Sequence, residues 1–248
     1  SAKQPTNSAT TAMVKRVGQR LATAVETYLN EHGMAADAKE YSWEFNLVQD
    51  KSVNAFCMPG GKIVVYEGLL PITQDEASLA IVLGHEIAHA VAKHSAEQMS
   101  KQIKNQYGTQ ILGQVLNAAG VSSSTTQLAQ IIAQKGLQFR SLKYSRDNES
   151  EADHMGLIFA AMAGYDPNVA VTFWQRMAQA TGSNNQSDIF SDHPSDAKRI
   201  AAIKQELPEA LTYYKPVKTT TTTKKTTTST KKKTRTTSKK KKTTTRRK

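Results

Sequence analysis

The stretch "LGHEIAHAVAKH", residues 83–94, places three histidines and one glutamate within a short span. On a helix, His85 and His89 project from one face one turn apart, so two imidazoles can reach a single zinc ion at about 2.0–2.1 Å. Glu86 lies about 100° around that helix, close enough to polarise a metal-bound water without being a ligand. In this HExxH arrangement, zinc lowers the pKa of the water and the glutamate takes its proton. The sequence therefore predicts one zinc ion, with Glu86 as general base.

His94 is the remaining histidine of the stretch, and its spacing argues against a role as third ligand. It follows His85 by nine residues, which is about 900° and hence half a turn off the ligand face of a straight helix. The pattern of metalloproteases with a third histidine would also need Gly and His where this chain has Ala92 and Ser95. We expect His94 on the surface or in the core, without contact to the metal.

A carboxylate from elsewhere must complete the site, because catalytic zinc combines three protein ligands with one open position. In "SRDNESEADHMG", Glu149 and Asp153 are four residues apart on a predicted helix, while Glu151 points about 200° away from Glu149. We take Glu149 as the third ligand. Asp153 is placed to accept a hydrogen bond from the free N–H of a ligand histidine and to fix its tautomer. The alternative is an exposed acidic helix start that the helix dipole favours.

Apolar periodicity predicts the elements that position these residues. Residues 10–31 form an amphipathic helix, "YSWEFNLV" a half-buried strand, and "SVNAFCM" and "KIVVYEG" a hairpin around the turn signal "PGG". A long helical stretch from the N-cap candidate Thr73 to Gly108 carries the HExxH motif. Residues 108–136 are either a helical hairpin or a mobile lid. Later helices are expected at residues 146–163, 167–180 and 194–206.

The positive charge is concentrated at the C-terminal end. The formal net charge is +12, but residues 216–248 hold 14 of the 33 Lys and Arg residues and none of the acidic ones, so the remainder is close to neutral. This Thr- and Lys-rich segment has little to bury, and we expect a disordered basic tail after a domain of residues 1–215. The tail can bind an anionic membrane surface or another polyanion. Without interleaved aromatics or a base-reading motif, no specific nucleic acid is expected.

The paired motifs HExxH and "ESEAD" resemble those of the gluzincin metallopeptidase family that includes HtpX, the CAAX prenyl proteases, the bacterial periplasmic proteases BepA and LoiP, and the mitochondrial Oma-type protease. "VNAFCMPGGKIVVYEGLL" and "DHPSDAKRI" resemble this family in order and spacing, so the resemblance covers about residues 14–203. It implies a zinc-dependent endopeptidase with His85, His89 and Glu149 as ligands and Glu86 as general base.

The resemblance also assigns residues around the cleft. It implies that the strand with Asn54, Ala55 and Phe56 is the cleft's edge and pairs with an extended substrate. His193 and Arg199 resemble the family's His-Pro…Arg segment. His193 would stabilise the oxyanion, or occupy the open position of zinc and hold the enzyme latent, while Arg199 would support it or bind substrate. "HPSD" equally reads as a helix start with Pro at N1.

Cys57 is the only cysteine, so neither a disulfide framework nor a cysteine-based zinc cluster can form. Its thiol would either block the zinc from the cleft strand or, as we favour, act as a small buried hydrophobe. No apolar run approaches the roughly 18 residues of a membrane span, which predicts a soluble body. The chain opens on Ser1, so we expect a processed form whose targeting segment is not in this sequence.

We therefore expect one mostly helical α+β domain, zincin-like, with a small β-sheet packed beside the HExxH helix. The absence of spans around that helix resembles the soluble, envelope-facing BepA and LoiP type. We expect a cell-envelope protein, periplasmic or membrane-associated through an upstream segment, that cleaves extended or misfolded polypeptides in quality control. The alternative is a latent or chaperone-like, zinc-stabilised module that binds polypeptides with little cleavage, kept closed by residues 108–136 and His193.

Overall fold

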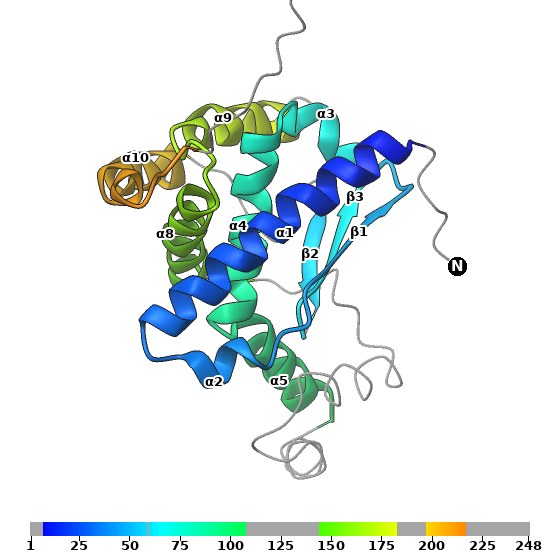
Figure 1. Cartoon of the computed structure of the whole chain (residues 1–248). Coiled ribbons are helices and arrows are strands. Elements are labelled where there is room, and N and C mark those ends of the chain that lie inside the picture. Colours follow the sequence, from blue (N-terminus) through cyan, green and yellow to red (C-terminus); the bar gives the residue numbers. More distant parts are fainter. Residues whose placement is uncertain (1–6, 59, 108–143, 183–196, 217–248) are drawn as a thin grey trace, which may run out of the picture. The chain divides into compact units, whose positions relative to one another are not determined.

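The computed structural model describes residues 7–58, 60–107, 144–182 and 197–216. The chain divides into two compact units, Ser1–Val217 and Lys218–Lys248, and every described element belongs to the first. In chain order these are α1 (Ser8–Glu31), α2 (Ala35–Ala38), β1 (Glu44–Val48), β2 (Ala55–Met58), β3 (Lys62–Tyr66), the 3-10 turn η1 (Glu67–Leu69), α3 (Leu70–Thr73), α4 (Glu76–Val91), α5 (His94–Tyr107), α8 (Arg146–Met162), α9 (Val169–Gly182) and α10 (Ala197–Thr212) (Figure 1). The expected helical α+β class with one small sheet is confirmed.

Several predictions concern residues outside this description. The hairpin or lid at residues 108–136, the role of His193 and the disorder of the basic tail all stay predictions, as does the domain boundary after residue 215. Among the described residues, no helix combines the length and apolar character needed to cross a bilayer.

The sheet has three strands in the order β1-β3-β2, so β2 is an edge strand of the described sheet. β1 runs parallel to β3, with Phe45 opposite Ile63, and β2 runs antiparallel to it, with Cys57 opposite Ile63. The "PGG" hairpin is confirmed: Gly60 and Gly61 have φ values of +82° and +84°, a left-handed conformation that glycine adopts without steric cost. Figure 1 shows β2 beside α4, and the two elements are in contact.

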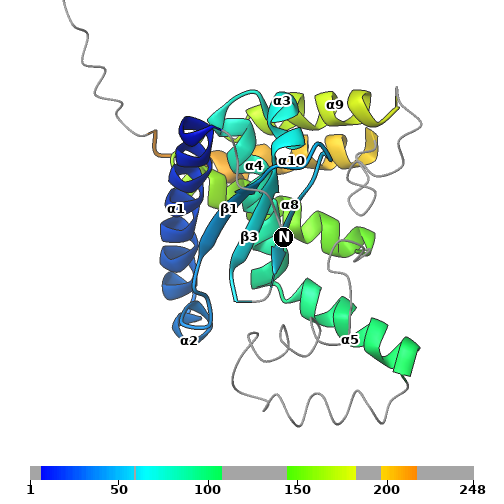
Figure 2. The same ribbon diagram turned by 90° about the vertical axis from the view of Figure 1, so that its right-hand side faces the viewer.

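α1 covers the sheet and the central helix through one apolar stripe. Asn7 caps its N-terminus by accepting hydrogen bonds from the amides of Ala9 and Thr10. The stripe is fully buried and consists of Val14, Val17, Leu21, Val25 and Leu29. α1 packs against β1, α4 and α8, and Figure 2 shows it alongside β1. The amphipathic helix expected at residues 10–31 is therefore confirmed, two residues longer at its start.

α4 is the buried axis of the domain, and its N-cap differs from the one expected. Asp75 caps it by accepting from the amide of Ser78 at 2.7 Å, whereas Thr73 is the last residue of α3. The Thr73 prediction was wrong because Gln74, with φ +66°, has a non-helical backbone conformation and so separates α3 from α4. Every residue of α4 from Ser78 to His89 is buried, as expected for a helix that is apolar on all sides.

The single long helix expected up to Gly108 is also wrong. α4 ends at Val91, and α5 begins at His94. Between them Lys93 has φ +59°, the left-handed conformation that commonly ends helices. The break changes the helical phase, so the direction of His94 does not follow from counting 100° per residue from His85.

α4 and α8 cross at two glycines. A Cβ placed on Gly84 would lie 2.7 Å from the carbonyl oxygen of Gly156, and a Cβ on Gly156 would lie 2.8 Å from the backbone nitrogen of His85. Any larger residue would push the helices apart, since real Cβ atoms do not approach that closely. The middle of α8 is thereby held against the turn of α4 in which the HExxH motif begins.

Candidate metal centre

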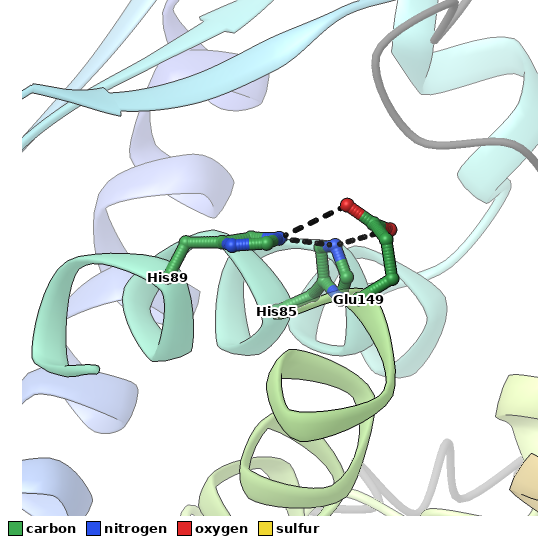
Figure 3. Close-up of side chains that lie close together, drawn as sticks. All are labelled: His85, His89 and Glu149. Carbon is green, nitrogen blue, oxygen red and sulfur yellow. Dashed lines mark hydrogen bonds and ion pairs between the residues drawn. The ribbon is translucent and has the colours of Figure 1, made fainter. Parts of the chain in front are cut away.

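The crossing of α4 and α8 brings two imidazoles and one carboxylate to a common point. Nε2 of His85 and Nε2 of His89 lie 3.1 Å apart, and the two oxygens of Glu149 lie 3.5 Å and 3.4 Å from them (Figure 3). All three residues are buried. They form the group among the described residues whose donor atoms could hold a metal ion.

The donor set fits a zinc ion. Two ligand atoms about 2.0–2.1 Å from a tetrahedral metal lie roughly 3.3 Å apart. The two imidazole nitrogens are separated by a similar distance, and so is each of them from one of the two oxygens of Glu149. Two neutral imidazoles that face each other through their lone pairs repel unless a cation or a proton lies between them. Imidazole nitrogens and a carboxylate oxygen are also the donors that catalytic zinc prefers.

His85 is oriented by a carboxylate on the opposite side of its ring. Its Nδ1 lies 3.0 Å from Oδ1 of Asp153, which fixes the Nδ1–H tautomer and leaves Nε2 for the metal. Burial and the nearby Arg199 charge lower the pKa of His85, which favours the neutral, ligating imidazole. Burial alone would raise the pKa of Asp153, but Arg199 and the hydrogen bond with His85 hold it below its usual value.

Arg199 is buried beside the two carboxylates of the site. It donates two hydrogen bonds of 2.7 Å to Asp153, and its Nη1 lies 3.1 Å from Oε2 of Glu149. Its guanidinium also stacks on the ring of Trp174, with 3.5 Å between Cζ and the ring centroid. These contacts hold the two carboxylates Asp153 and Glu149, while the support of His193 and the binding of substrate by Arg199 stay predictions. Burial would lower the pKa of Arg199, but the neighbouring carboxylates raise it, so the residue stays charged.

His89 has a different set of neighbours, which sequence reasoning missed. Its Nδ1 lies 3.0 Å from Nδ1 of His94, and Nε2 of His94 lies 3.2 Å from Oε2 of Glu151. Tyr144 stacks on His89 at a centroid distance of 3.9 Å, and its hydroxyl is 2.9 Å from Oγ of Ser95. His94 is buried in the core, outside the metal-donor group.

Glu86 follows the first ligand on α4 and is buried. Cys57 on β2 is buried as well, and burial, with an additional effect of the Glu86 charge, raises the pKa of its thiol. The Cys57 thiol donates to the carbonyl oxygen of Met58 and belongs to the hydrophobic core. These contacts are those of the small buried hydrophobe that we favoured.

The predicted substrate strand presents backbone groups at its outer edge. The amide of Tyr66 donates to the carbonyl of Asn54 at 3.0 Å, so these residues form a hydrogen-bonded pair of the antiparallel ladder. Such pairs alternate along a ladder. The N–H and C=O groups of Ala55 and Cys57 therefore point away from β3, while those of Phe56 point toward it.

A mostly helical domain in which an HExxH helix and a second helix bring two imidazoles and a carboxylate to one point is a zincin-like domain, the class that the fold and the site define. The chain belongs to peptidase family M48, which it matches over residues 8–207.

Relatives of the chain are named as metalloendopeptidases or as a protease. The chain is 38% identical over 207 residues to mitochondrial metalloendopeptidase OMA1 of Schizosaccharomyces pombe, covering 83% of this chain and 56% of that protein. It is 32% identical over 176 residues to human mitochondrial metalloendopeptidase OMA1, covering 69% and 34%. It is 30% identical over 186 residues to the β-barrel assembly-enhancing protease of Escherichia coli K12, covering 70% and 37%. The chain thus spans from about a third to just over half of these relatives.

Proposed function

We propose that this chain is a zinc-dependent endopeptidase that hydrolyses peptide bonds in extended or misfolded polypeptides. The observation that carries the proposal is the buried cluster of His85, His89 and Glu149, whose donor atoms are spaced for one tetrahedral zinc. Membership of peptidase family M48 supports the same activity.

The three clustered side chains would hold the zinc ion. When bound, zinc would supply Lewis-acid polarisation of the scissile carbonyl and lower the pKa of a water molecule. His85 enters this role with its tautomer set by Asp153, and Glu149 enters it with one oxygen beside Arg199. The buried guanidinium offsets part of the negative charge that Glu149 and Asp153 bring into the core.

Glu86 would perform the proton transfers. Its carboxylate would take a proton from the attacking water and later deliver it to the leaving amine nitrogen. The position one residue after His85 places it next to the cluster without making it a member of the donor group. Its buried setting restricts the water that competes for that proton.

The substrate would lie along β2 as an additional strand. The outward N–H and C=O groups of Ala55 and Cys57 would bind the substrate backbone, which gives affinity with little dependence on side chains. The contact of β2 with α4 would bring that backbone to the HExxH helix. Such a site selects extended segments, which folded proteins rarely expose.

The deciding experiment measures zinc content and casein cleavage for the intact chain, for Glu149→Ala and for the control Asp147→Ala. Asp147 is exposed on the same helix, so its loss should leave both values unchanged. We expect one zinc per intact chain, lost together with cleavage in Glu149→Ala. A Glu149→Ala variant that keeps zinc and activity would overturn the site. Zinc without cleavage in the intact chain would overturn the enzyme and favour a latent or chaperone-like binding module.

We propose a cell-envelope location and a role in protein quality control. The support is the name of one compared relative, a β-barrel assembly-enhancing protease, whereas two others are named as mitochondrial. Fractionation of the native host, probed with an antibody to this chain, tests the location. Recovery in the cytosol alone would contradict it.

We also propose that the basic tail can bind an anionic membrane surface or polyanion. The support is its charge, because 14 of the chain's Lys and Arg residues lie in residues 216–248. Binding to anionic vesicles should weaken steeply with salt and disappear when residues 216–248 are deleted. Binding that survives the deletion would place the contact elsewhere.

A further inference from the structure

His94 and Glu151 form a chain of contacts that ends on a metal-site imidazole. His85 and Glu149 lie on the Nε2 side of His89, whereas His94 lies on its Nδ1 side at 3.0 Å. The other nitrogen of His94 is 3.2 Å from Glu151. His94 is 3% exposed, and Glu151 reaches it from a side chain that is 57% exposed.

One proton arrangement satisfies the contacts from His89 to His94 and from His94 to Glu151 when both imidazoles are neutral. If Nε2 of His89 is to bind zinc through its lone pair, its Nδ1 must carry the hydrogen and donate it to Nδ1 of His94. That nitrogen of His94 must then be bare, so its Nε2 carries the hydrogen and donates it to Glu151. The opposite tautomer of His94 would place two N–H groups against each other at 3.0 Å.

We propose that His94 and Glu151 are the positioning pair for His89: they fix its tautomer and ring orientation for zinc. The proposal rests on the zinc site of the proposed function. It gives His89 a support that corresponds to the one Asp153 gives His85, built from an imidazole and a surface carboxylate instead of a buried ion pair. In other proteins, loss of a partner of this kind lowers metal affinity about 10- to 100-fold.

The geometry distinguishes this role from that of a metal ligand. The Nδ1 of His94 faces Nδ1 of His89, which is the nitrogen that does not face His85 and Glu149. The second nitrogen of His94 faces Glu151. His94 therefore acts on the metal site through His89.

The helix break produces this contact. With Lys93 in the left-handed conformation, α5 starts in a new direction and His94 folds back over the last turn of α4. Glu151 comes from α8, two residues after Glu149, on a side of that helix turned away from the metal. α8 therefore supplies both the ligand Glu149 and the support residue Glu151, while α4 supplies the ligand histidines and α5 supplies His94.

The test uses the full chain with three substitutions and a control. His94→Leu removes the acceptor but keeps bulk, and His94→Asn restores an acceptor oxygen near the position of Nδ1. Glu151→Ala removes the carboxylate that accepts the hydrogen bond from Nε2 of His94. Glu26→Gln removes one carboxylate from an exposed position on α1 and serves as control. Zinc affinity is measured by competition with a chromophoric chelator, and folding by circular dichroism.

We expect His94→Leu to fold and to bind zinc about 10- to 100-fold more weakly. His94→Asn should recover most of that loss, Glu151→Ala should lose less than His94→Leu, and Glu26→Gln should match the intact chain. Nitrogen NMR of the imidazoles adds a readout that a packing defect would not move. The Nδ1–H of His89 should be protected from exchange in the intact chain and in His94→Asn, and unprotected in His94→Leu.

The outcomes separate this inference from the proposed function. Unchanged zinc affinity in His94→Leu, alongside loss in Glu149→Ala, would overturn the positioning pair and leave the zinc site standing. Zinc binding without proteolysis would overturn the enzyme while the pair could still be confirmed. A hydrogen on Nε2 of His89 in the zinc-loaded chain, or equal losses in His94→Leu and His94→Asn, would overturn the pair. If His94→Leu fails to fold, the Asn and Glu151 variants and the NMR signal decide.

Discussion

Oδ1 of Asp153 lies 3.0 Å from Nδ1 of His85, and both oxygens of the same carboxylate accept hydrogen bonds of 2.7 Å from Arg199. One buried side chain thus orients a metal-site imidazole and neutralises a buried cation. Its ionisation is therefore coupled to the folding of the whole centre.

Asp153→Asn should destabilise the metal-free chain by about 3 kcal/mol at pH 7, because it leaves Arg199 with one buried carboxylate fewer. Because the folded-state pKa of Asp153 is lowered, its contribution is fully present above the unfolded value near 3.8 and is lost as the pH falls through the folded value. The stability gap between the intact chain and Asp153→Asn should therefore narrow below about pH 4. Urea unfolding at pH 7, 4 and 3 measures it.

The exposed Asp147 supplies the control for this measurement. Asp147→Asn should change the free energy of unfolding by no more than about 0.5 kcal/mol at pH 7. A gap for Asp153→Asn that stays constant from pH 7 to pH 3 would contradict the coupling of Asp153 to Arg199.

Glu86→Gln should abolish proteolysis while leaving zinc in place, because the amide cannot accept the proton of the attacking water. General-base losses of this kind are about 10²- to 10⁴-fold. Casein cleavage and zinc content of the same preparation check it, with Glu26→Gln as a charge-matched control on the exposed face of α1. Full activity in Glu86→Gln would show that another group accepts the proton.

Gly156→Ala should weaken zinc binding although residue 156 is not a metal ligand. In a helix interior, Ala is about 1 kcal/mol more favourable than Gly, so propensity alone predicts stabilisation. The added Cβ would lie 2.8 Å from the backbone nitrogen of His85, and overpacking of this kind costs about 1–3 kcal/mol. We expect a lower melting temperature and weaker zinc binding than in the exposed control Ser150→Ala. Equal zinc affinity in both variants would show that α4 and α8 can separate without moving the ligands.

Peptide substrates offer a test of β2 that leaves the protein unchanged. If an added strand bonds with Ala55 and Cys57, then N-methylation of every second residue in a peptide should remove a hydrogen bond with β2. Each lost bond is worth about 0.5–1.5 kcal/mol, which raises KM roughly 2- to 12-fold. The intervening positions should tolerate methylation. A loss that does not alternate along the peptide would exclude strand addition.

Local spacing was enough to predict which side chains of the candidate site share a helix face. His85 and His89, like Glu149 and Asp153, are four residues apart on single helices, so their common faces follow from helical geometry alone. The hairpin could be predicted because its turn needs the two glycines that the sequence supplies. These features depend on interactions within a few residues.

Other parts of the site depend on tertiary contacts and could not be predicted from spacing. The position of His94 follows from a helix break at Lys93, a residue type with no strong preference for the left-handed conformation. The close crossing of α4 and α8 requires Gly84 and Gly156 to meet, and nothing local pairs them. The family resemblance placed Arg199 near the cleft. Its ion pairs with Glu149 and Asp153 form only when the domain packs, so spacing could not predict them.

The left-handed residue between α4 and α5 also constrains which changes of length the chain can accept. An insertion or deletion of one residue between His89 and His94 would change the direction of α5 and move His94 relative to His89. Point substitutions at Ala92 or Lys93 preserve the count and the direction of α5, and a glycine at position 93 would relieve its backbone. The residue types in this connection can therefore change more easily than the number of residues in it.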